Sequence, residues 1–174
     1  GSSSSGATIG HFRMNEMDLI LWRHADAGDS VVDPVADLKR KLTDRGRKQS
    51  ERGARWLQAR LPERYLVLSS PAVRATETAA ALGARFKVDE RLAPGSDVAH
   101  HLAAVNWPDG PEARVRHVIV VGHQPTLGRL ASLLLAGSEA DWSIKKSGIW
   151  WLSTRERGGQ AQVVLRAAIA PDLI

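Results

Sequence analysis

The chain contains no cysteine among its 174 residues. This absence excludes disulfide bridges and thiolate catalysis, and it is compatible with a reducing cytoplasm, where we expect the protein to act. Long apolar runs are also missing: the longest are the size of a strand, whereas a helix that crosses a bilayer needs roughly 20 apolar residues. We therefore expect no membrane partner.

Metal-binding patterns are scarce as well. The sequence has neither an Asp-rich cluster nor a His-x-x-x-His pair, so we predict no resident metal ion and no cofactor. His100 and His101 are adjacent, and neighbouring side chains of a helix point about 100° apart, which makes joint coordination of one ion difficult. We interpret both as residues of a surface helix.

Positive charge exceeds negative charge only modestly, with a net charge of +5 and 25% charged residues. Basic residues gather between Asp37 and Arg55, and Lys145 and Lys146 add to them. One interpretation is a solvated helix with acidic neighbours, and the other is a basic rim that attracts an anionic partner. Aromatic residues make up 5% and form no stacking platform beside these charges, so we do not predict nucleic-acid binding.

The first 13 residues, "GSSSSGATIGHFR", are small, polar and aperiodic. We expect this segment to be an expression leader without fixed structure. The remaining length, residues 14–174, fits one ordinary domain with a sizeable core.

Apolar strands alternate with helices along that domain. Residues 25–42 are polar and contain Gly28 and Pro34, which predicts a loop with a short helical turn. The predicted strands cover residues 18–22, 65–71 and 117–123, with a weaker one in 86–92. The predicted helices cover residues 44–60, 71–83, 97–105 and 124–137. A predicted hairpin around Gly158 and Gly159 covers residues 149–169. This order predicts an α/β fold of three layers, α/β/α, with a mostly parallel central sheet.

Three predicted strands end in residues that could bind an anion. The first ends on Arg23 and His24, the second on serines followed by Arg74, and the third on His123. Because ligands bind beyond the carboxyl ends of parallel strands, these side chains should meet in one pocket. Two guanidinium groups, two imidazoles and the amides of helix N-termini suit a phosphoryl group.

Four sequence blocks resemble the histidine phosphatase (phosphoglycerate mutase-like) superfamily. "LILWRHA" resembles its Arg-His-Gly signature, with Ala25 where glycine is usual, and "LTDRG" resembles its Leu-Thr-x-x-Gly element. "LSSPAVRATETA" resembles its Ser-x-x-x-Arg-Ala-x-x-Thr element, and "VVGHQPTL" its Gly-His element. The blocks follow the expected order from Leu19 to Leu127. The short chain, with no large cap domain, most resembles the compact SixA-type phosphohistidine phosphatases.

This resemblance implies a metal-independent phosphatase and a role for each matching residue. His24 would be the nucleophile and would become a transient phosphohistidine. Arg23 and Arg74 would bind the phosphoryl oxygens, and His123 would donate to them as an imidazolium. Further candidates for substrate binding are Ser70, Asp29 and Gln124.

The general acid is open at this stage. Larger relatives place a carboxylate near the leaving oxygen, and the candidates here are Asp26, Asp29, Glu90 and Asp97. If the substrate is itself a phosphohistidine, its leaving group is an imidazole, which needs at most modest protonation. A strong acid would then be dispensable.

The expected substrate is a histidine-phosphorylated signalling or phosphotransfer domain, which gives phosphate as product and implies a role in signal transduction. A basic rim would steer such an acidic phosphoprotein to the pocket. Two alternatives remain: a phosphatase of small phosphomonoesters or phosphosugars, and a phosphoryl-binding module that no longer catalyses. Ala25 bears on the last of these because glycine permits a closer backbone approach to a ligand.

Tryptophans are the most frequent aromatic residue, with six in the chain. Trp150 and Trp151 are consecutive in a predicted strand, so their side chains should face opposite sides of the sheet. At most one of the two is then expected to reach solvent, where it could form a docking surface.

Overall fold

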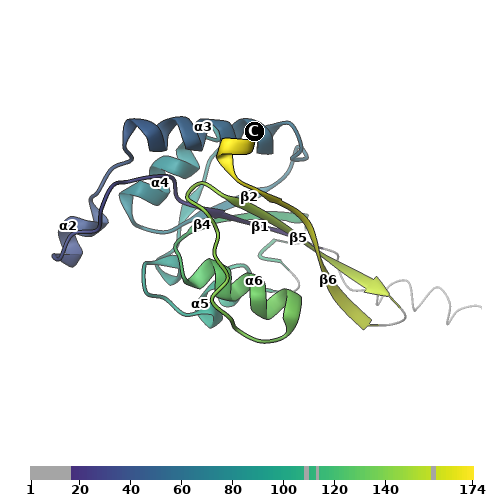
Figure 1. Ribbon diagram of the computed structural model, residues 1–174. Helices are drawn as coiled ribbons and strands as arrows, with labels where there is room; N and C mark the ends of the chain where they lie inside the picture. Colours follow the sequence, from purple (N-terminus) through teal and green to yellow (C-terminus); the bar gives the residue numbers. More distant parts are fainter. Residues whose placement is uncertain (1–16, 108–109, 113, 158–159) are drawn as a thin grey trace, which may run out of the picture.

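The computed structural model describes residues 17–107, 110–112, 114–157 and 160–174, and one mixed six-stranded sheet runs through them (Figure 1). The strand order is β3-β2-β4-β1-β5-β6. The first four strands in this order are parallel to one another. Strand β5 pairs antiparallel with β1, and β6 pairs antiparallel with β5. Their bounds are β1 Asp18–Arg23, β2 Leu66–Ser69, β3 Lys87–Val88, β4 His117–Gly122, β5 Ile149–Arg157 and β6 Gln160–Ile169.

Helices cover both faces of this sheet. Figure 1 shows α3 (Asp44–Gln58) and α4 (Val73–Ala80) above it, and α5 (Val98–Ala104) and α6 (Thr126–Ala136) below it. A short helix, α2 (Pro34–Leu38), stands at the carboxyl edge of β1, and two 3₁₀ turns, η1 (Glu90–Leu92) and η2 (Pro171–Leu173), complete the described elements. The predicted three-layer α/β/α fold is confirmed, and the described residues contain no large cap domain.

The alternation of side chains along the central strands builds the two halves of the core. Leu19 and Leu21 of β1 pack with the α5 and α6 layer, whereas Ile20 and Trp22 pack with the α3 and α4 layer. All four are fully buried. A strand covered on both faces needs apolar residues in succession, which explains the continuous run that predicted it.

Element boundaries agree with the sequence predictions to within a few residues. The helical turn expected in residues 25–42 is confirmed as α2, and the weak strand candidate is confirmed as the two-residue β3. Strands β5 and β6 pair antiparallel as the predicted hairpin, although its turn at residues 158–159 lies outside the described residues, as does the expected leader. None of the helices in the described ranges has the length and apolar character that a membrane span requires.

The two consecutive tryptophans face opposite sides of β5, as predicted. Trp151 is buried in the α3 layer, where its ring meets Trp56 edge-on at 6.0 Å between centroids. Trp150 packs on the other layer against Trp142, at 5.9 Å. Both rings serve packing within the protein.

Candidate active site

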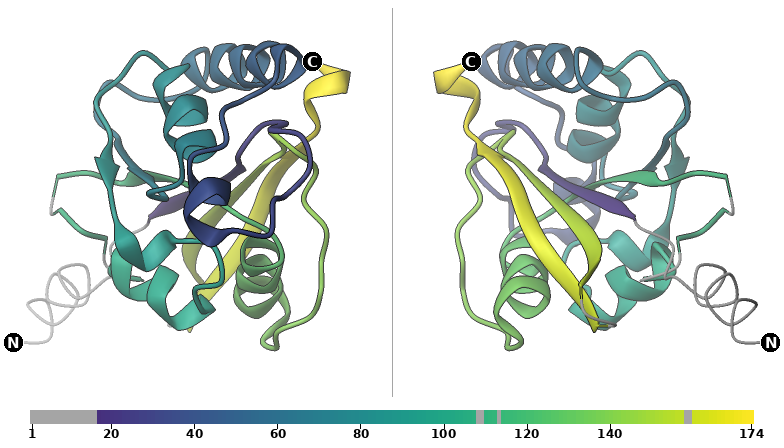
Figure 2. Two further views of the ribbon diagram at one scale, coloured as in Figure 1. Left: turned by 90° about the vertical axis from the view of Figure 1, so that its left-hand side faces the viewer. Right: turned by 90° about the vertical axis from the view of Figure 1, so that its right-hand side faces the viewer.

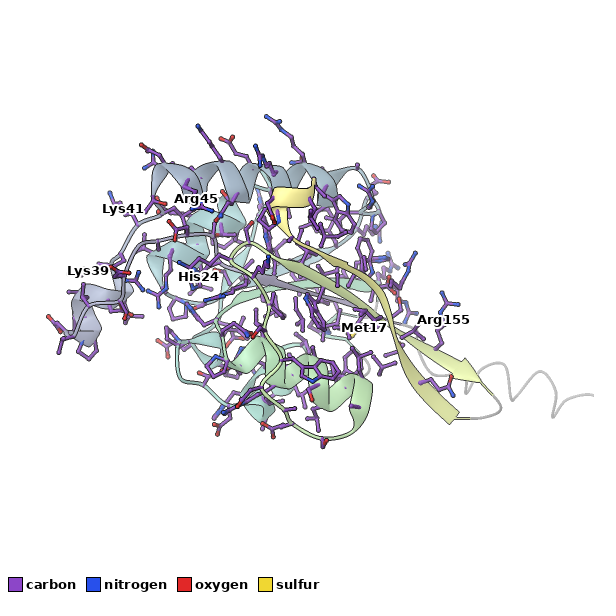
Figure 3. All side chains as sticks on the ribbon, viewed as in Figure 1. Met17, His24, Lys39, Lys41, Arg45 and Arg155 are labelled. Atoms are coloured by element: carbon purple, nitrogen blue, oxygen red, sulfur yellow. The ribbon has the colours of Figure 1, made fainter. Side chains whose placement is uncertain are left out.

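The carboxyl ends of β1, β2 and β4 lie side by side and bring their following residues together. The backbone N–H of His24 donates to the Gly122 carbonyl at 3.1 Å, and that of Ser70 donates to the Val121 carbonyl at 3.0 Å. These bonds extend the parallel ladder by one residue on each strand. His24 and His123 therefore leave neighbouring strands at the same level, and Figure 3 shows His24 at this edge of the sheet.

A cavity of about 350 Å³ opens at this edge. It brings together Arg23, His24, Arg74 and His123, the four residues that the sequence assigned to catalysis. Its other lining residues are Ala27, Gly28, Ser30, Asp37, Arg40, Pro94, Gln124 and Lys146. With Arg23, Arg74, Arg40 and Lys146 around it, the cavity is built for an anion.

The His24 ring is held in one tautomer. Its Nδ1 lies 2.8 Å from the Ala25 carbonyl, which can only accept a hydrogen bond, so Nδ1 carries the proton and Nε2 keeps a free electron pair. Burial lowers the pKa of His24 to about 4 from its usual 6.5, and Arg74 and Arg23 act in the same direction. The imidazole is therefore neutral at physiological pH, as a nucleophile must be.

His123 lies against His24, with 4.9 Å between the ring centroids. Its Nε2 is 2.7 Å from the Ser70 hydroxyl, and its buried Nδ1 has no partner among the described residues. Burial is the main cause that lowers the pKa of His123 to about 2, and the neighbouring His24 ring and the Arg74 guanidinium act in the same direction. The expected imidazolium is thus not the form present in the free site, because a dry position beside two guanidinium groups disfavours a third positive charge.

The two predicted arginines are each anchored through Nη1, and their Nε atoms have no partner in the part of the chain that the structure describes. Arg23 donates from Nη1 to the Ile144 carbonyl at 2.9 Å, and Arg74 donates from Nη1 to the Asp37 carbonyl at 2.7 Å. Burial lowers the pKa of both guanidinium groups, which nevertheless stay charged. A tetrahedral oxyanion would offer acceptors to these buried, unpaired N–H groups.

The sequence did not single out Asp37 and Arg40 as individual site residues, and both come from the α2 segment. The Asp37 carboxylate accepts from Arg40 Nε at 2.8 Å and lies 3.3 Å from Arg74 Nη2. Arg40 Nη1 also donates to the Ala27 and Gly28 carbonyls, which tie the segment to the residues after His24. An aperiodic loop gives no pattern from which such contacts could be predicted.

Lys146 is a further lining residue, and it comes from the loop before β5. Its ammonium group lies 2.7 Å from an Asp26 oxygen. The basic rim was expected from the residues between Asp37 and Arg55, with Lys145 and Lys146 as an extension. Of these basic residues, Arg40 and Lys146 line the cavity, and Lys145 does not.

The three additional substrate-binding candidates have different positions. Ser70 is fully buried behind His123 and supports that ring instead of lining the cavity. Gln124 lines the cavity, but its amide is engaged by the Trp142 carbonyl and the Gly128 N–H. Asp29 is exposed and is not brought into the cavity.

The four carboxylates considered as general acid do not line the cavity. Asp26 is bound by Lys146 and Thr43, and these hydrogen bonds lower its pKa. Glu90 and Asp97 are exposed. The carboxylate that does line the cavity is Asp37; burial would raise its pKa, but hydrogen bonds from Val31 and Arg40 hold it below the usual range, so Asp37 is ionised.

The "LTDRG" block fastens the start of α3 to the loop that follows His24. The Thr43 hydroxyl caps the helix by accepting from the Gly46 N–H at 3.0 Å, and it donates to an Asp26 carboxylate oxygen at 2.7 Å. A methyl group on Gly46 would overlap the Asp26 carbonyl oxygen. Glycine is therefore required by this close approach of two backbones.

Ala25, where the resemblance expects glycine, is fully buried in a small apolar cluster with Ala27 and Leu42. Its N–H donates to the Thr78 hydroxyl at 3.0 Å, and it does not line the cavity. The extra methyl group is thus accommodated by packing.

His101 corrects one prediction. His100 is exposed as expected, but His101 is buried, with Nδ1 2.9 Å from the Asp97 carbonyl. The expected divergence of the two side chains holds, whereas the expected exposure of His101 is wrong, because α5 turns that side chain toward β4 beside Gly122.

A larger cavity, of about 440 Å³, lies near the opposite edge of the sheet, where β1 and β4 begin. It is lined by Trp56, Arg60, His117, Trp151, Arg166 and Ala167. Two basic side chains there are already paired with a carboxylate: Arg166 Nη1 and His117 Nε2 lie 2.9 and 3.4 Å from Asp18 Oδ2. The cavity at the carboxyl edge is the better candidate because Arg23, Arg40 and Arg74 line it together with the neutral imidazole of His24.

Comparison with known proteins shows the family to which the chain belongs. The Histidine phosphatase superfamily (branch 1) matches residues 19–95. Phosphohistidine phosphatase SixA of Escherichia coli is 31% identical over 127 residues, which cover 70% of this chain and 76% of SixA.

Two solved structures show the same fold. A SixA protein from Nakamurella multipartitia is 28% identical with a TM-score of 0.70, and the match covers 91% of this chain and 98% of that one. The protein histidine phosphatase SixA complexed with tungstate is also 28% identical, with a TM-score of 0.69 over 90% and 99% of the two chains. The chain therefore belongs to the histidine phosphatase superfamily.

Proposed function

We propose that this protein hydrolyses a protein phosphohistidine through a covalent intermediate on His24, without a metal ion. The observation that carries the proposal is one cavity that gathers a neutral imidazole with a free Nε2, two buried guanidinium groups and a second imidazole. Membership of a phosphatase superfamily with SixA relatives supports it.

The reaction proceeds in two displacements at phosphorus. His24 Nε2 attacks the phosphoryl group; a new N–P bond forms as the bond from phosphorus to the substrate imidazole breaks. A substrate ring that already carries a proton leaves as neutral imidazole, so no carboxylic acid is needed in the cavity. Water then attacks phospho-His24, returns the free imidazole and releases phosphate.

Arg23 and Arg74 would hold the phosphoryl oxygens during both steps. Charge on these oxygens is spread over three positions in the transition state, and fixed guanidinium forks stabilise it without reorganisation. When the Ser70 hydroxyl donates to Nε2 of His123, the proton of this ring is on Nδ1. The Nδ1–H group, which has no partner among the described residues, would then donate a hydrogen bond to a phosphoryl oxygen. These cations supply the neutralisation that Mg²⁺ gives a kinase, and a chelator should therefore leave turnover unchanged.

The substrate class is tested by comparing rates. Initial rates of phosphate release should be measured on a histidine-phosphorylated phosphotransfer domain and on a panel of sugar phosphates at equal concentration. We expect kcat/KM to be higher for the protein, because no cap domain among the described residues closes the cavity around a small ligand. Faster turnover of a sugar phosphate would favour the small-substrate alternative, and release from neither would favour a binding module.

Cytoplasmic action and a role in signal transduction belong to the same proposal. The role in signal transduction depends on the substrate being a signalling domain, and the rate comparison tests that part.

A further inference from the structure

Exposed apolar side chains concentrate on one side of the cavity. Of nine large hydrophobic residues exposed in the described part of the chain, four lie in or directly before α2: Val31, Val32, Val35 and Leu38, which we call the apolar ridge. Val32 is fully exposed, at 101%, and α2 contributes no buried residue to the core. Single exposed apolar residues are ordinary, but a cluster on a projecting helix marks a surface that contacts another molecule.

The ridge adjoins the cavity directly. Ser30, Asp37 and Arg40 of the same segment line the cavity wall. Figure 2, left, views the protein from the side of α2 and shows this helix projecting from the face on which the carboxyl edge of the sheet opens.

A basic groove lies on the other side of the cavity. It has a volume of about 360 Å³ and is lined by Arg23, Arg45, Gln49, Lys145, Lys146, Pro171 and Asp172. Arg23 and Lys146 line both the groove and the cavity, so the two hollows adjoin each other.

Part of the positive charge on this face is not paired within the described residues, although Lys146 binds Asp26. Within the described ranges, Arg45 and Lys145 form no ion pair, and neither do the exposed Lys39 and Lys41 that follow α2. Figure 3 shows Lys39, Lys41 and Arg45 on the same side of the molecule as His24. Asp172 is the acidic residue among those that line the groove.

We infer that the apolar ridge and the basic groove together form the docking surface for the phosphorylated protein. This inference rests on the proposed function and names the partner's chemistry: a folded domain whose phosphohistidine is flanked by an apolar patch on one side and by carboxylates on the other. The ridge buries the patch, the groove pairs with the carboxylates, and the phosphoryl group enters the cavity between them.

A second copy of this chain fits the surface less well. Two copies meeting at this face would close both cavities to substrate, and neither the ridge nor the groove offers a row of carboxylates to pair with the basic groove of the other copy. A small phosphorylated ligand would fill the cavity and leave the ridge uncovered.

The test compares two substrates on surface variants. The ridge variant Val32→Asp/Val35→Asp and the groove variant Arg45→Glu/Lys145→Glu change exposed side chains outside the cavity lining. Matched controls are Val164→Asp and Arg155→Glu, which lie on β6 and β5 toward the far end of the sheet, where Figure 3 shows Arg155. Rates are measured on a histidine-phosphorylated phosphotransfer domain and on free phosphohistidine.

We expect kcat/KM on the protein substrate to fall by about tenfold or more in both surface variants. The control variants should stay within about twofold of wild type on the protein substrate. On free phosphohistidine, all variants should stay within about twofold of wild type. Added salt should slow wild type on the protein substrate and have less effect on the groove variant. Unchanged protein rates in the surface variants would overturn the docking surface while leaving the proposed function intact. No activity of wild type on the protein domain would refute the proposed function, and a dimer that Val32→Asp/Val35→Asp dissociates would assign the ridge to self-association.

Discussion

The state of individual side chains decides what chemistry the cavity supports. His24 is kept neutral by burial, and the Ala25 carbonyl fixes its proton on Nδ1. An exposed histidine at the end of a strand would be partly protonated near pH 6.5 and would not present one defined nitrogen. Burial at the edge of the sheet therefore gives His24 the neutral ring and the defined tautomer that the proposed nucleophile requires.

His24 should titrate well below the usual range of a histidine. Because its pKa is lowered to about 4, the ring stays neutral as the pH falls from 8 to 5 and gains its proton only below that. The measurement is an NMR titration of the histidine Cε1–H signals, with His24 assigned by comparison with His24→Asn. A midpoint near 6.5 for that signal would contradict the burial argument.

The Asp37 carboxylate contacts the guanidinium groups of both Arg74 and Arg40. We therefore propose that Asp37 is a positioning residue for these two cations.

Replacing Asp37 by alanine should lower kcat/KM by about tenfold to hundredfold, since Arg74 loses its defined orientation. Asp37→Asn should recover part of this loss because an amide oxygen still accepts a hydrogen bond, and a merely structural role would not separate the two variants. Asp29→Ala is the matched control and should leave the rate unchanged. Equal rates for Asp37→Ala and wild type would rule out the positioning role.

At the scale of elements, the site depends on how α3 is joined to the loop after β1. Thr43 both caps α3 and binds Asp26, and Gly46 allows the Asp26 carbonyl to approach the helix backbone. The loop that begins with His24 is thus fixed by the first turn of the next long helix.

A substitution of Gly46 by alanine should therefore affect stability and activity together. The added methyl group meets backbone atoms that cannot rotate away, which should cost about 1–3 kcal/mol of the free energy of unfolding. Urea unfolding measures this cost, and turnover of the same variant reports on the displaced loop. Lys48→Ala, at an exposed position of the same helix, is the control; a Gly46→Ala variant as stable as this control would contradict the close approach.

The same elements show what the sequence could and could not predict. Arg23, His24 and His123 were predictable because the ends of buried parallel strands must share one edge, and strong apolar runs located those strands. Asp37 and Arg40 were not individually predictable as site residues, since their contacts come from a polar segment without periodicity. The role of Ser70 was also out of reach, because only the placement of β4 shows that its hydroxyl faces His123.

At the scale of the whole molecule, the buried imidazoles link stability to pH. Unfolded histidines titrate near pH 6.5, whereas the folded protein lowers the pKa of His24 to about 4 and that of His123 to about 2. Between pH 6.5 and 4 the unfolded chain binds more protons than the native chain. The contribution of these two histidines to the free energy of unfolding is therefore fully present above pH 6.5 and decreases as the pH falls below that value. Each such group contributes up to about 1.4 kcal/mol per pH unit in this window.

The free energy of unfolding should accordingly fall between pH 7 and pH 5 in urea titrations of wild type. His123→Gln removes one of the imidazoles and should show a shallower decline over the same range. A decline of equal slope in both proteins would show that His123 is not buried in its neutral form.

The central claim is that His24 accepts the phosphoryl group, and the most direct test is to trap that intermediate. Wild type is mixed with a phosphohistidine protein, quenched within milliseconds without acid, digested and analysed by mass spectrometry. In wild type we expect a phosphoryl group on His24 that acid removes. In His24→Asn we expect no phosphorylated residue at this position and no release of phosphate. Phosphate release by His24→Asn at the wild-type rate, or a phosphoryl group on another residue, would contradict the central claim.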